Sequence, residues 1–126
     1  MPPTIDEIVE RARRRLARVT PEQAAAELAQ GALVVDIRTE SGRAVEGEIP
    51  GVVAIDRTVL EWRLDPTSPS RLEQAKDHQV RVIVVCAEGY SSSLAAASLQ
   101  DIGLLNATDV IGGFEAWKAA SLPIKP

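Results

Sequence analysis

The chain has 126 residues, of which 45% are hydrophobic and 25% charged, and its net charge is −4. This length suits one domain with a buried core, and the composition excludes a disordered or fibrous protein. The apolar runs are much shorter than a membrane-spanning helix requires, and no charged-then-apolar leader opens the chain. We therefore expect a cytoplasmic protein without membrane contact. The negative charge also argues against nucleic acid as a partner.

Cysteine and histidine occur once each, as Cys86 and His78. A single cysteine cannot form an internal disulfide, and these two residues cannot supply the four ligands of a structural zinc site. We therefore expect neither a metal nor a cofactor. Cys86 is then either a small buried hydrophobe or a reactive thiol, and its sequence neighbours must distinguish the two.

The first predicted element is an amphipathic helix over residues 4–18. Thr4 and Glu7 form a capping-box pair, and apolar residues follow at helical spacing. The other face of this helix is basic, and its arginines are Arg11, Arg13, Arg14, Arg15 and Arg18. We interpret this face as solvated, with ion pairs to acidic residues one turn away, rather than as a phosphate or membrane site.

The remaining elements alternate between helices and strands. A second helix begins at the capping box of Thr20 and Gln23 and ends at Gly31. Apolar runs predict strands at residues 32–37, 52–55, 80–85 and 107–111, and helices are predicted at residues 58–64, 94–102 and 114–120. Buried strands that alternate with helices predict an α/β domain with a mainly parallel sheet.

Cys86 stands at the carboxyl end of the strongest strand, directly before a helix that begins near Ser92. Loops at this end of a parallel sheet bind ligands, and backbone N–H groups at a helix start favour an anion. The loop residues are Ala87, Glu88, Gly89, Tyr90, Ser91 and Ser92. Their amides are expected to lower the pKa of the Cys86 thiol, and Gly89 permits the positive φ of a tight turn. The serine hydroxyls are candidates for capping the helix or for binding a sulfur ligand.

Four motifs together resemble the rhodanese family. They are Asp36-Ile37-Arg38, Gly47-Glu48-Ile49-Pro50-Gly51, the segment Cys86–Ser92, and Gly112-Gly113-Phe114-Glu115-Ala116-Trp117. The resemblance covers residues 20–126 and implies a five-stranded parallel sheet flanked by helices. It also implies that Cys86 takes sulfane sulfur from a donor as a persulfide and passes it to a thiophilic acceptor, which is cyanide, a thiol or a protein. Residues 1–19 form an extra helix outside the match, and we expect the loop to remain intact without residues 1–18.

The sequence departs from the family pattern at the loop. Many relatives carry arginine or lysine there, whereas this loop has no basic residue and contains Glu88. We therefore expect thiosulfate, an anionic donor, to be used poorly. Arg63 is a candidate for the missing cation, and Trp62 beside it is a candidate pocket wall. Glu48 stands where relatives often have histidine.

Other residues around the predicted loop have structural interpretations. Asp36 and Arg38 end the first strand, where an ion pair that supports the loops is the simplest role.

Two other functions fit parts of the pattern. A rhodanese-like domain can serve as a protein-interaction module without turnover, because a fold alone does not establish activity. A phosphatase or arsenate reductase of related architecture needs a C-x5-R loop, and the position of its arginine is occupied here by Ser92. We reject that second class, and we leave the oligomeric state open.

Overall fold

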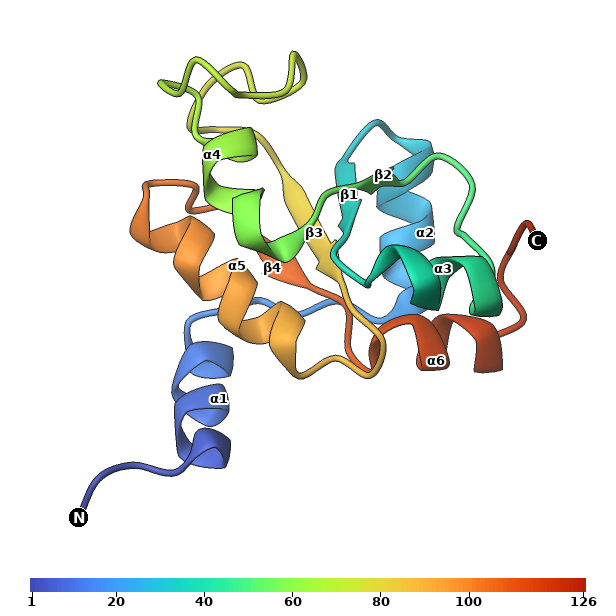
Figure 1. Cartoon of the computed structure of the whole chain (residues 1–126), viewed down its shortest axis with the longest axis horizontal. Coiled ribbons are helices and arrows are strands. Elements are labelled where there is room, and N and C mark those ends of the chain that lie inside the picture. Colours follow the sequence, from blue (N-terminus) through green and yellow to red (C-terminus); the bar gives the residue numbers. More distant parts are fainter.

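The computed structural model describes all 126 residues. Its centre is a sheet of four parallel strands in the order β2-β1-β3-β4 (Figure 1). The strands are β1 (Leu33–Asp36), β2 (Val53–Ala54), β3 (Val82–Val85) and β4 (Thr108–Asp109). The prediction of an α/β domain with a parallel sheet is confirmed.

The expected fifth strand is reduced to a single pairing. Val19 forms an isolated parallel bridge with Val110, in which the Val19 N–H donates to Asp109 and the Ile111 N–H donates to Val19. Thr20 already caps the next helix, so the chain leaves the sheet edge after one residue. The sheet therefore has one strand fewer than the resemblance implied.

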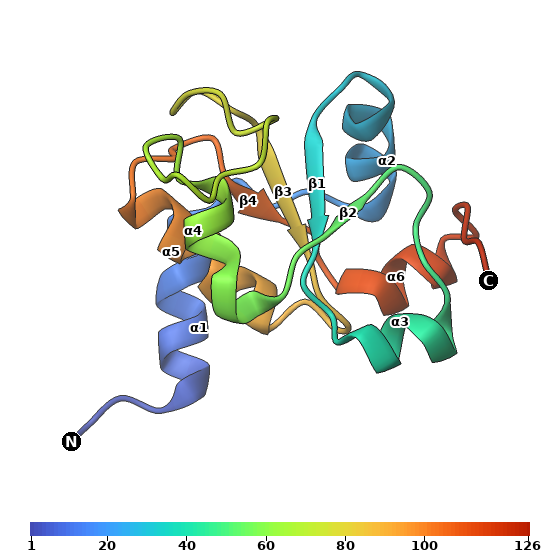
Figure 2. The ribbon, with the colours of Figure 1, turned by 45° about the horizontal axis from the view of Figure 1, so that its top comes forward.

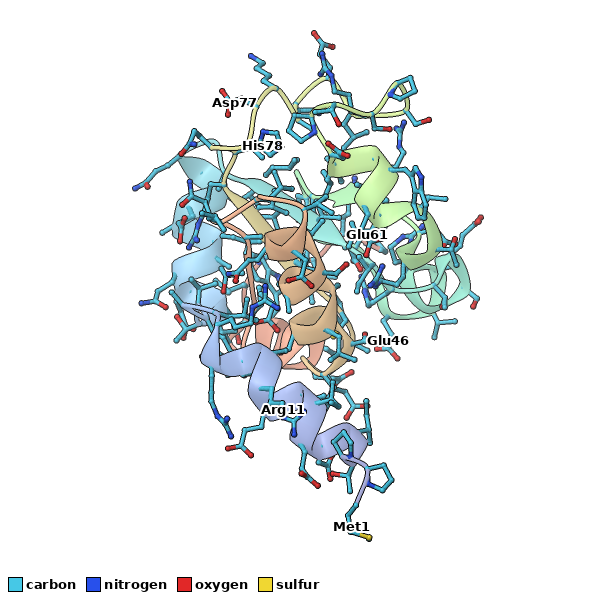
Figure 3. The ribbon with its side chains drawn as sticks, turned by 90° about the vertical axis from the view of Figure 1, so that its left-hand side faces the viewer. Met1, Arg11, Glu46, Glu61, Asp77 and His78 are labelled. Atoms are coloured by element: carbon cyan, nitrogen blue, oxygen red, sulfur yellow. The ribbon has the colours of Figure 1, made fainter.

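Helices cover both faces of the sheet (Figure 2). One face packs against α4 (Leu60–Leu64) and α5 (Ser91–Asp101), and the other against α2 (Pro21–Ala29) and α6 (Gly113–Ala119). A short 3-10 helix, η1 (Arg57–Val59), precedes α4. The long connection from α4 to β3 contains Asp77 and His78 and lies at the amino ends of the strands (Figure 3).

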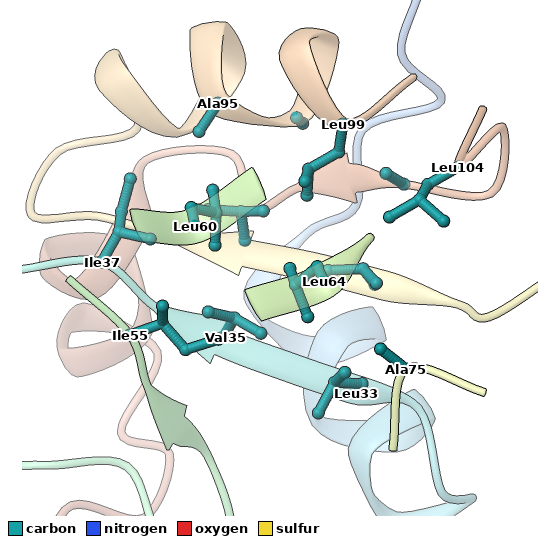
Figure 4. Packing of buried hydrophobic residues seen from close by; sticks show 14 of the residues in the cluster. Leu33, Val35, Ile37, Ile55, Leu60, Leu64, Ala75, Ala95, Leu99 and Leu104 are labelled. Carbon is teal, nitrogen blue, oxygen red and sulfur yellow. The ribbon is translucent and has the colours of Figure 1, made fainter. Parts of the chain in front are cut away.

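Apolar side chains from alternate positions of the strands divide into two cores. Val35 of β1 packs with Leu60, Leu64 and Leu99 on the side of α4 and α5 (Figure 4). The second core, on the side of α2 and α6, contains Val34, Ile83, Val85, Val110, Phe114 and Trp117. Burial of β1 and β3 on both faces explains why these strands read as continuous apolar runs.

Helix α3 (Glu40–Glu46), which connects β1 to β2, was not predicted from the sequence. This helix buries none of its residues, so no apolar periodicity marks it. Its start is fixed by Thr39, whose hydroxyl accepts the Gly42 N–H at 3.0 Å. The cap alone was therefore the only sequence signal for this helix.

The first helix, α1 (Ile5–Arg14), has the expected Thr4–Glu7 capping box. It does not lie on the sheet but packs on the outside of α5, with Val9 and Ala12 buried (Figures 1 and 2). None of the helices has the length and apolar composition needed to cross a membrane.

Candidate active site

Cys86 follows β3 directly, and the strand carries its sulfur to the carboxyl edge of the sheet. The residue is 5% exposed. Two backbone amides donate to its Sγ, that of Gly89 at 3.1 Å and that of Ser92 at 3.3 Å. The expected convergence of loop amides on the sulfur is present in the structure. Gly89 has a φ of +87°, as its place in the tight turn requires.

Further amides of the loop are free to bind a ligand. The backbone N–H groups of Ala87, Glu88, Tyr90 and Ser91 make no hydrogen bond within the chain. A hollow of about 230 Å³ is lined by Cys86 and these same four residues. Such a cradle of unpaired donors suits an anionic group attached to the cysteine.

The surroundings lower the pKa of the Cys86 thiol below its ordinary value of 9.0. Burial is the largest single influence and acts to raise the pKa, but the hydrogen bonds from Ser92, Ser91 and Gly89 together outweigh it. The thiolate is the nucleophilic form of cysteine. The loop therefore favours the reactive form of Cys86 without a histidine base.

Helix α6 holds the first half of the loop from behind. The N–H of Phe114 donates to the Cys86 carbonyl at 2.8 Å, and that of Glu115 donates to the Ala87 carbonyl at 3.0 Å. The approach is so close that a Cβ at Gly113 would lie 2.5 Å from the Cys86 carbonyl oxygen. The Gly-Gly-Phe segment thus packs closely against the loop. The hydrogen bonds from α6 keep the carbonyls of Cys86 and Ala87 away from the sulfur.

A buried carboxylate anchors the serines that follow the loop. The hydroxyls of Ser92 and Ser93 donate to Asp109 Oδ2 at 2.7 and 2.8 Å, and Asp109 is fully buried in β4. Ser92 and Ser93 are themselves buried, whereas Ser91 is exposed and lines the hollow. These contacts hold in place the Ser92 amide that reaches the sulfur.

A second cavity, of about 290 Å³, adjoins Cys86 between α3 and α6. Its polar lining includes Glu46 and Glu115, and its one cationic side chain is Arg38. Lys118 lies 3.8 Å from Glu46. Arg38 is paired with Asp36, which compensates its charge, and its Nη1 is buried without a hydrogen-bond partner.

Asp36 and Arg38 form a buried ion pair, with Arg38 Nη2 at 2.8 Å from Asp36 Oδ2. The same nitrogen donates to the Gly47 carbonyl at 2.8 Å, and the guanidinium lies 3.8 Å from the centre of the Phe114 ring. The pair thus joins the Asp-Ile-Arg motif to the turn at Gly47 and to α6. It shapes one wall of the cavity.

The structure places Trp62 and Arg63 outside both hollows that contain Cys86. Trp62 is 61% exposed. Arg63 donates to the Ser70 carbonyl at 2.6 Å, in the connection between α4 and β3. Arg63 is therefore not positioned as a cation for the cysteine loop.

The interpretation of the N-terminal arginines as a solvated face is wrong for Arg13 and Arg18. Both donate to the Gly89 carbonyl, at 2.7 and 3.1 Å. Asp109, the partner of Arg18, was also not predicted as a site residue. A carboxylate inside the apolar run 107–111 was the available signal, because a buried charge requires a partner.

Comparison with known proteins shows the family to which this chain belongs. The family model of the rhodanese-like domain matches residues 20–120. The thiosulfate sulfurtransferase GlpE of Pseudomonas entomophila is 38% identical over 102 residues, which cover 81% of this chain and 84% of the relative. GlpE of Haemophilus influenzae is 34% identical over 106 residues, covering 84% and 91% of the two chains.

A solved structure extends the similarity over the whole chain. A protein of unknown function from Rhodopseudomonas palustris, described as a possible tyrosine phosphatase, is 32% identical with a TM-score of 0.86. The match covers 99% of both chains, and therefore includes α1. The fold and the site define an α/β protein whose cysteine lies in a loop with backbone amides suited to binding an anion. The chain belongs to the rhodanese-like family.

Proposed function

We propose that this protein is a sulfurtransferase that carries sulfane sulfur as a persulfide on Cys86. The observation that carries the proposal is the set of loop amides, two bonded to Sγ and four unpaired around the hollow beside it. These amides stabilise a negative charge on either the thiolate or the terminal sulfur of the persulfide. The curated relatives named thiosulfate sulfurtransferase support the same reaction class.

The reaction consists of two nucleophilic displacements. The Cys86 thiolate attacks the sulfane sulfur of the donor, a new Sγ–S bond forms, and the donor's bond to that sulfur breaks. The leaving group departs with the electron pair of the broken bond. When the donor is thiosulfate, the leaving group is sulfite. An acceptor nucleophile then attacks the terminal sulfur, and the Cys86 thiolate leaves. Sulfur transfer therefore needs no outside oxidant or reductant.

The charges around Cys86 favour some donors over others. Glu88 in the loop and the carboxylates of Glu46 and Glu115 in the adjoining cavity oppose a dianion such as thiosulfate. We therefore assign the better donor to the class of uncharged or protein-bound persulfides, with cyanide, a thiol or a protein as acceptor. We place the reaction in the cytoplasm, where thiols remain reduced.

A phosphatase activity has less support. Ser92 occupies the position of the arginine that would clamp a phosphate, and its hydroxyl is engaged by Asp109. The one guanidinium that lines a cavity containing Cys86 is that of Arg38, and it is paired with Asp36.

Mass spectrometry tests the proposed function directly. Reduced protein incubated with thiosulfate, or with a small uncharged persulfide, should gain the mass of one sulfur atom, and cyanide should remove that atom as thiocyanate. The Cys86→Ser variant should do neither, because a hydroxyl is a weak nucleophile at neutral pH. If no donor loads the wild-type protein, or if Cys86→Ser turns over at the same rate, the domain is an interaction module and not a sulfurtransferase.

A further inference from the structure

Two arginines of the N-terminal segment donate to one carbonyl of the cysteine loop. Arg13 Nη2, on α1, lies 2.7 Å from the Gly89 oxygen, and Arg18 Nη2 lies 3.1 Å from it. Arg13 Nε also donates to Ser93 Oγ at 3.1 Å. Hydrogen bonds from charged donors are stronger than those between neutral groups. The segment outside the rhodanese-like match therefore fixes a peptide of the loop itself.

Arg18 is held in turn by the buried carboxylate of β4. Its Nε lies 2.8 Å from Asp109 Oδ1 and its Nη2 lies 3.2 Å from Oδ2. Asp109 thus accepts four hydrogen bonds, two from Arg18 and one each from Ser92 and Ser93. A buried charge with this many donors is well compensated and holds its partners in one geometry.

The two hydrogen bonds to the Gly89 carbonyl determine the direction of the unpaired Tyr90 N–H. The Gly89–Tyr90 peptide is trans, so its C=O and N–H point in opposite directions in one plane. With the carbonyl held toward Arg13 and Arg18, the Tyr90 N–H points away from these arginines, and Tyr90 is one of the residues that line the hollow beside Cys86. Helix α6 fixes the first half of the loop in a similar way, by donating hydrogen bonds to the carbonyls of Cys86 and Ala87.

Arg13 also places a positive charge beside a loop that has none of its own. Arg18 is neutralised by Asp109, whereas Arg13 donates only to neutral groups, a carbonyl and a hydroxyl. Its guanidinium lies 5.2 Å from the centre of the Tyr90 ring. The charge is therefore held against the outer side of the loop by three contacts.

We propose that Arg13, supported by Arg18 and Asp109, is a positioning residue for sulfur transfer, which orients the Gly89–Tyr90 peptide so that the Tyr90 N–H binds the terminal sulfur of the Cys86 persulfide. This inference rests on the proposed function, because it assigns a donor to the persulfide intermediate. It also gives α1 a role in the reaction, although this helix contributes no residue to either hollow beside Cys86.

The test compares Arg13→Ala and Arg13→Lys with Arg11→Ala. Arg11 is exposed on the same helix and is the matched control (Figure 3). Three quantities are measured on each full-length variant: the single-turnover rate of sulfur loading, the pH profile of Cys86 alkylation by iodoacetamide, and the melting temperature. Arg13→Ala should slow loading about tenfold and shift the alkylation profile to higher pH. Arg13→Lys keeps the charge but lacks the several donors of the guanidinium, and it should recover part of the rate.

The readouts separate this proposal from the proposed function. Arg13→Ala with the loading rate and alkylation profile of Arg11→Ala would overturn the positioning role. A lower melting temperature without a change in either reactivity would overturn it as well, since the contact would then be purely structural. If the wild-type protein loads no sulfur, the proposed function fails, but the alkylation profile still shows whether Arg13 controls the cysteine loop.

Discussion

At the scale of single residues, Cys86 combines burial with an environment that favours its anion. Burial alone would make the thiol inert, and it is the hydrogen bonds of Ser92, Ser91 and Gly89 that reverse this effect. The position of the cysteine before a loop and a helix was readable from the sequence. The anchoring of Ser92 by Asp109 was not, because it joins residues 17 apart through a contact between side chains.

The exposed carboxylate of Glu88 gives a prediction about donor choice. Glu88→Lys should raise kcat/KM for thiosulfate about two- to tenfold, because an opposite charge at the loop attracts the dianion and favours the thiolate. Steady-state kinetics at low and high salt measure the effect, which should shrink as salt screens it. Glu73→Lys changes the net charge equally in the connection between α4 and β3, and it should leave thiosulfate kinetics unaltered. Equal kinetics for both variants and the wild type would show that Glu88 does not influence the donor.

At the scale of elements, short-range sequence patterns predicted two helix starts correctly. The capping boxes at Thr4 and Thr20 both predicted helix starts that the structure shows. Helix α3 was not predicted because it buries no side chain, yet it supplies Gly42 and Glu46 to the cavity beside Cys86. The contacts of Arg13 on α1 and of Arg18 beyond its end were hidden for another reason. A basic segment looks the same in the sequence whether it meets water or another part of the chain.

The contact between α6 and the cysteine loop gives a prediction about Gly113. Gly113→Ala should cost about 1–3 kcal/mol of stability and most of the sulfur loading, because the residue has a φ of +58° and its Cβ would meet the Cys86 carbonyl. Gly31→Ala is the matched control, since Gly31 has a φ of +99° but no atom within 4 Å of the added Cβ. Urea unfolding and mass-spectrometric loading measure both variants. Loading that survives in Gly113→Ala would mean that the loop tolerates displacement from α6.

At the scale of the whole molecule, the order of the motifs along the chain was enough to predict the parallel α/β architecture. Short connections and buried strands restrict the topology strongly, so the sheet and its flanking helices could be inferred. The apolar runs predicted the four strands that the sheet has, whereas the resemblance implied a fifth, which is reduced to the single pairing of Val19. The docking of α1 on α5 could not be inferred, since an amphipathic helix specifies that it packs but not where.

The lowered pKa of Cys86 predicts a pH dependence of the stability of the whole molecule. Because the thiol pKa is lower in the folded than in the unfolded state, ionisation stabilises the fold fully above the unfolded pKa. This contribution decreases as the pH falls through the folded pKa. The difference in unfolding free energy between wild type and Cys86→Ser should therefore rise with pH below the ordinary thiol pKa of 9.0 and level off above it. Urea titrations across this range measure it, and a constant difference would indicate an unshifted thiol.

Helix α6, which holds the cysteine loop, follows that loop in the chain and is therefore synthesised after it. Cys86 leaves the ribosome before Phe114 and Glu115, whose amides hold the loop carbonyls, and before Asp109, which anchors Ser92. A single domain folds as a unit, so the loop is completed only when the elements that hold it are present. A nascent chain that stops before α6 thus carries a cysteine without its completed cradle. The carbonyls of Cys86 and Ala87 acquire their hydrogen-bond donors, and Ser92 its carboxylate partner, only when β4 and α6 have been made.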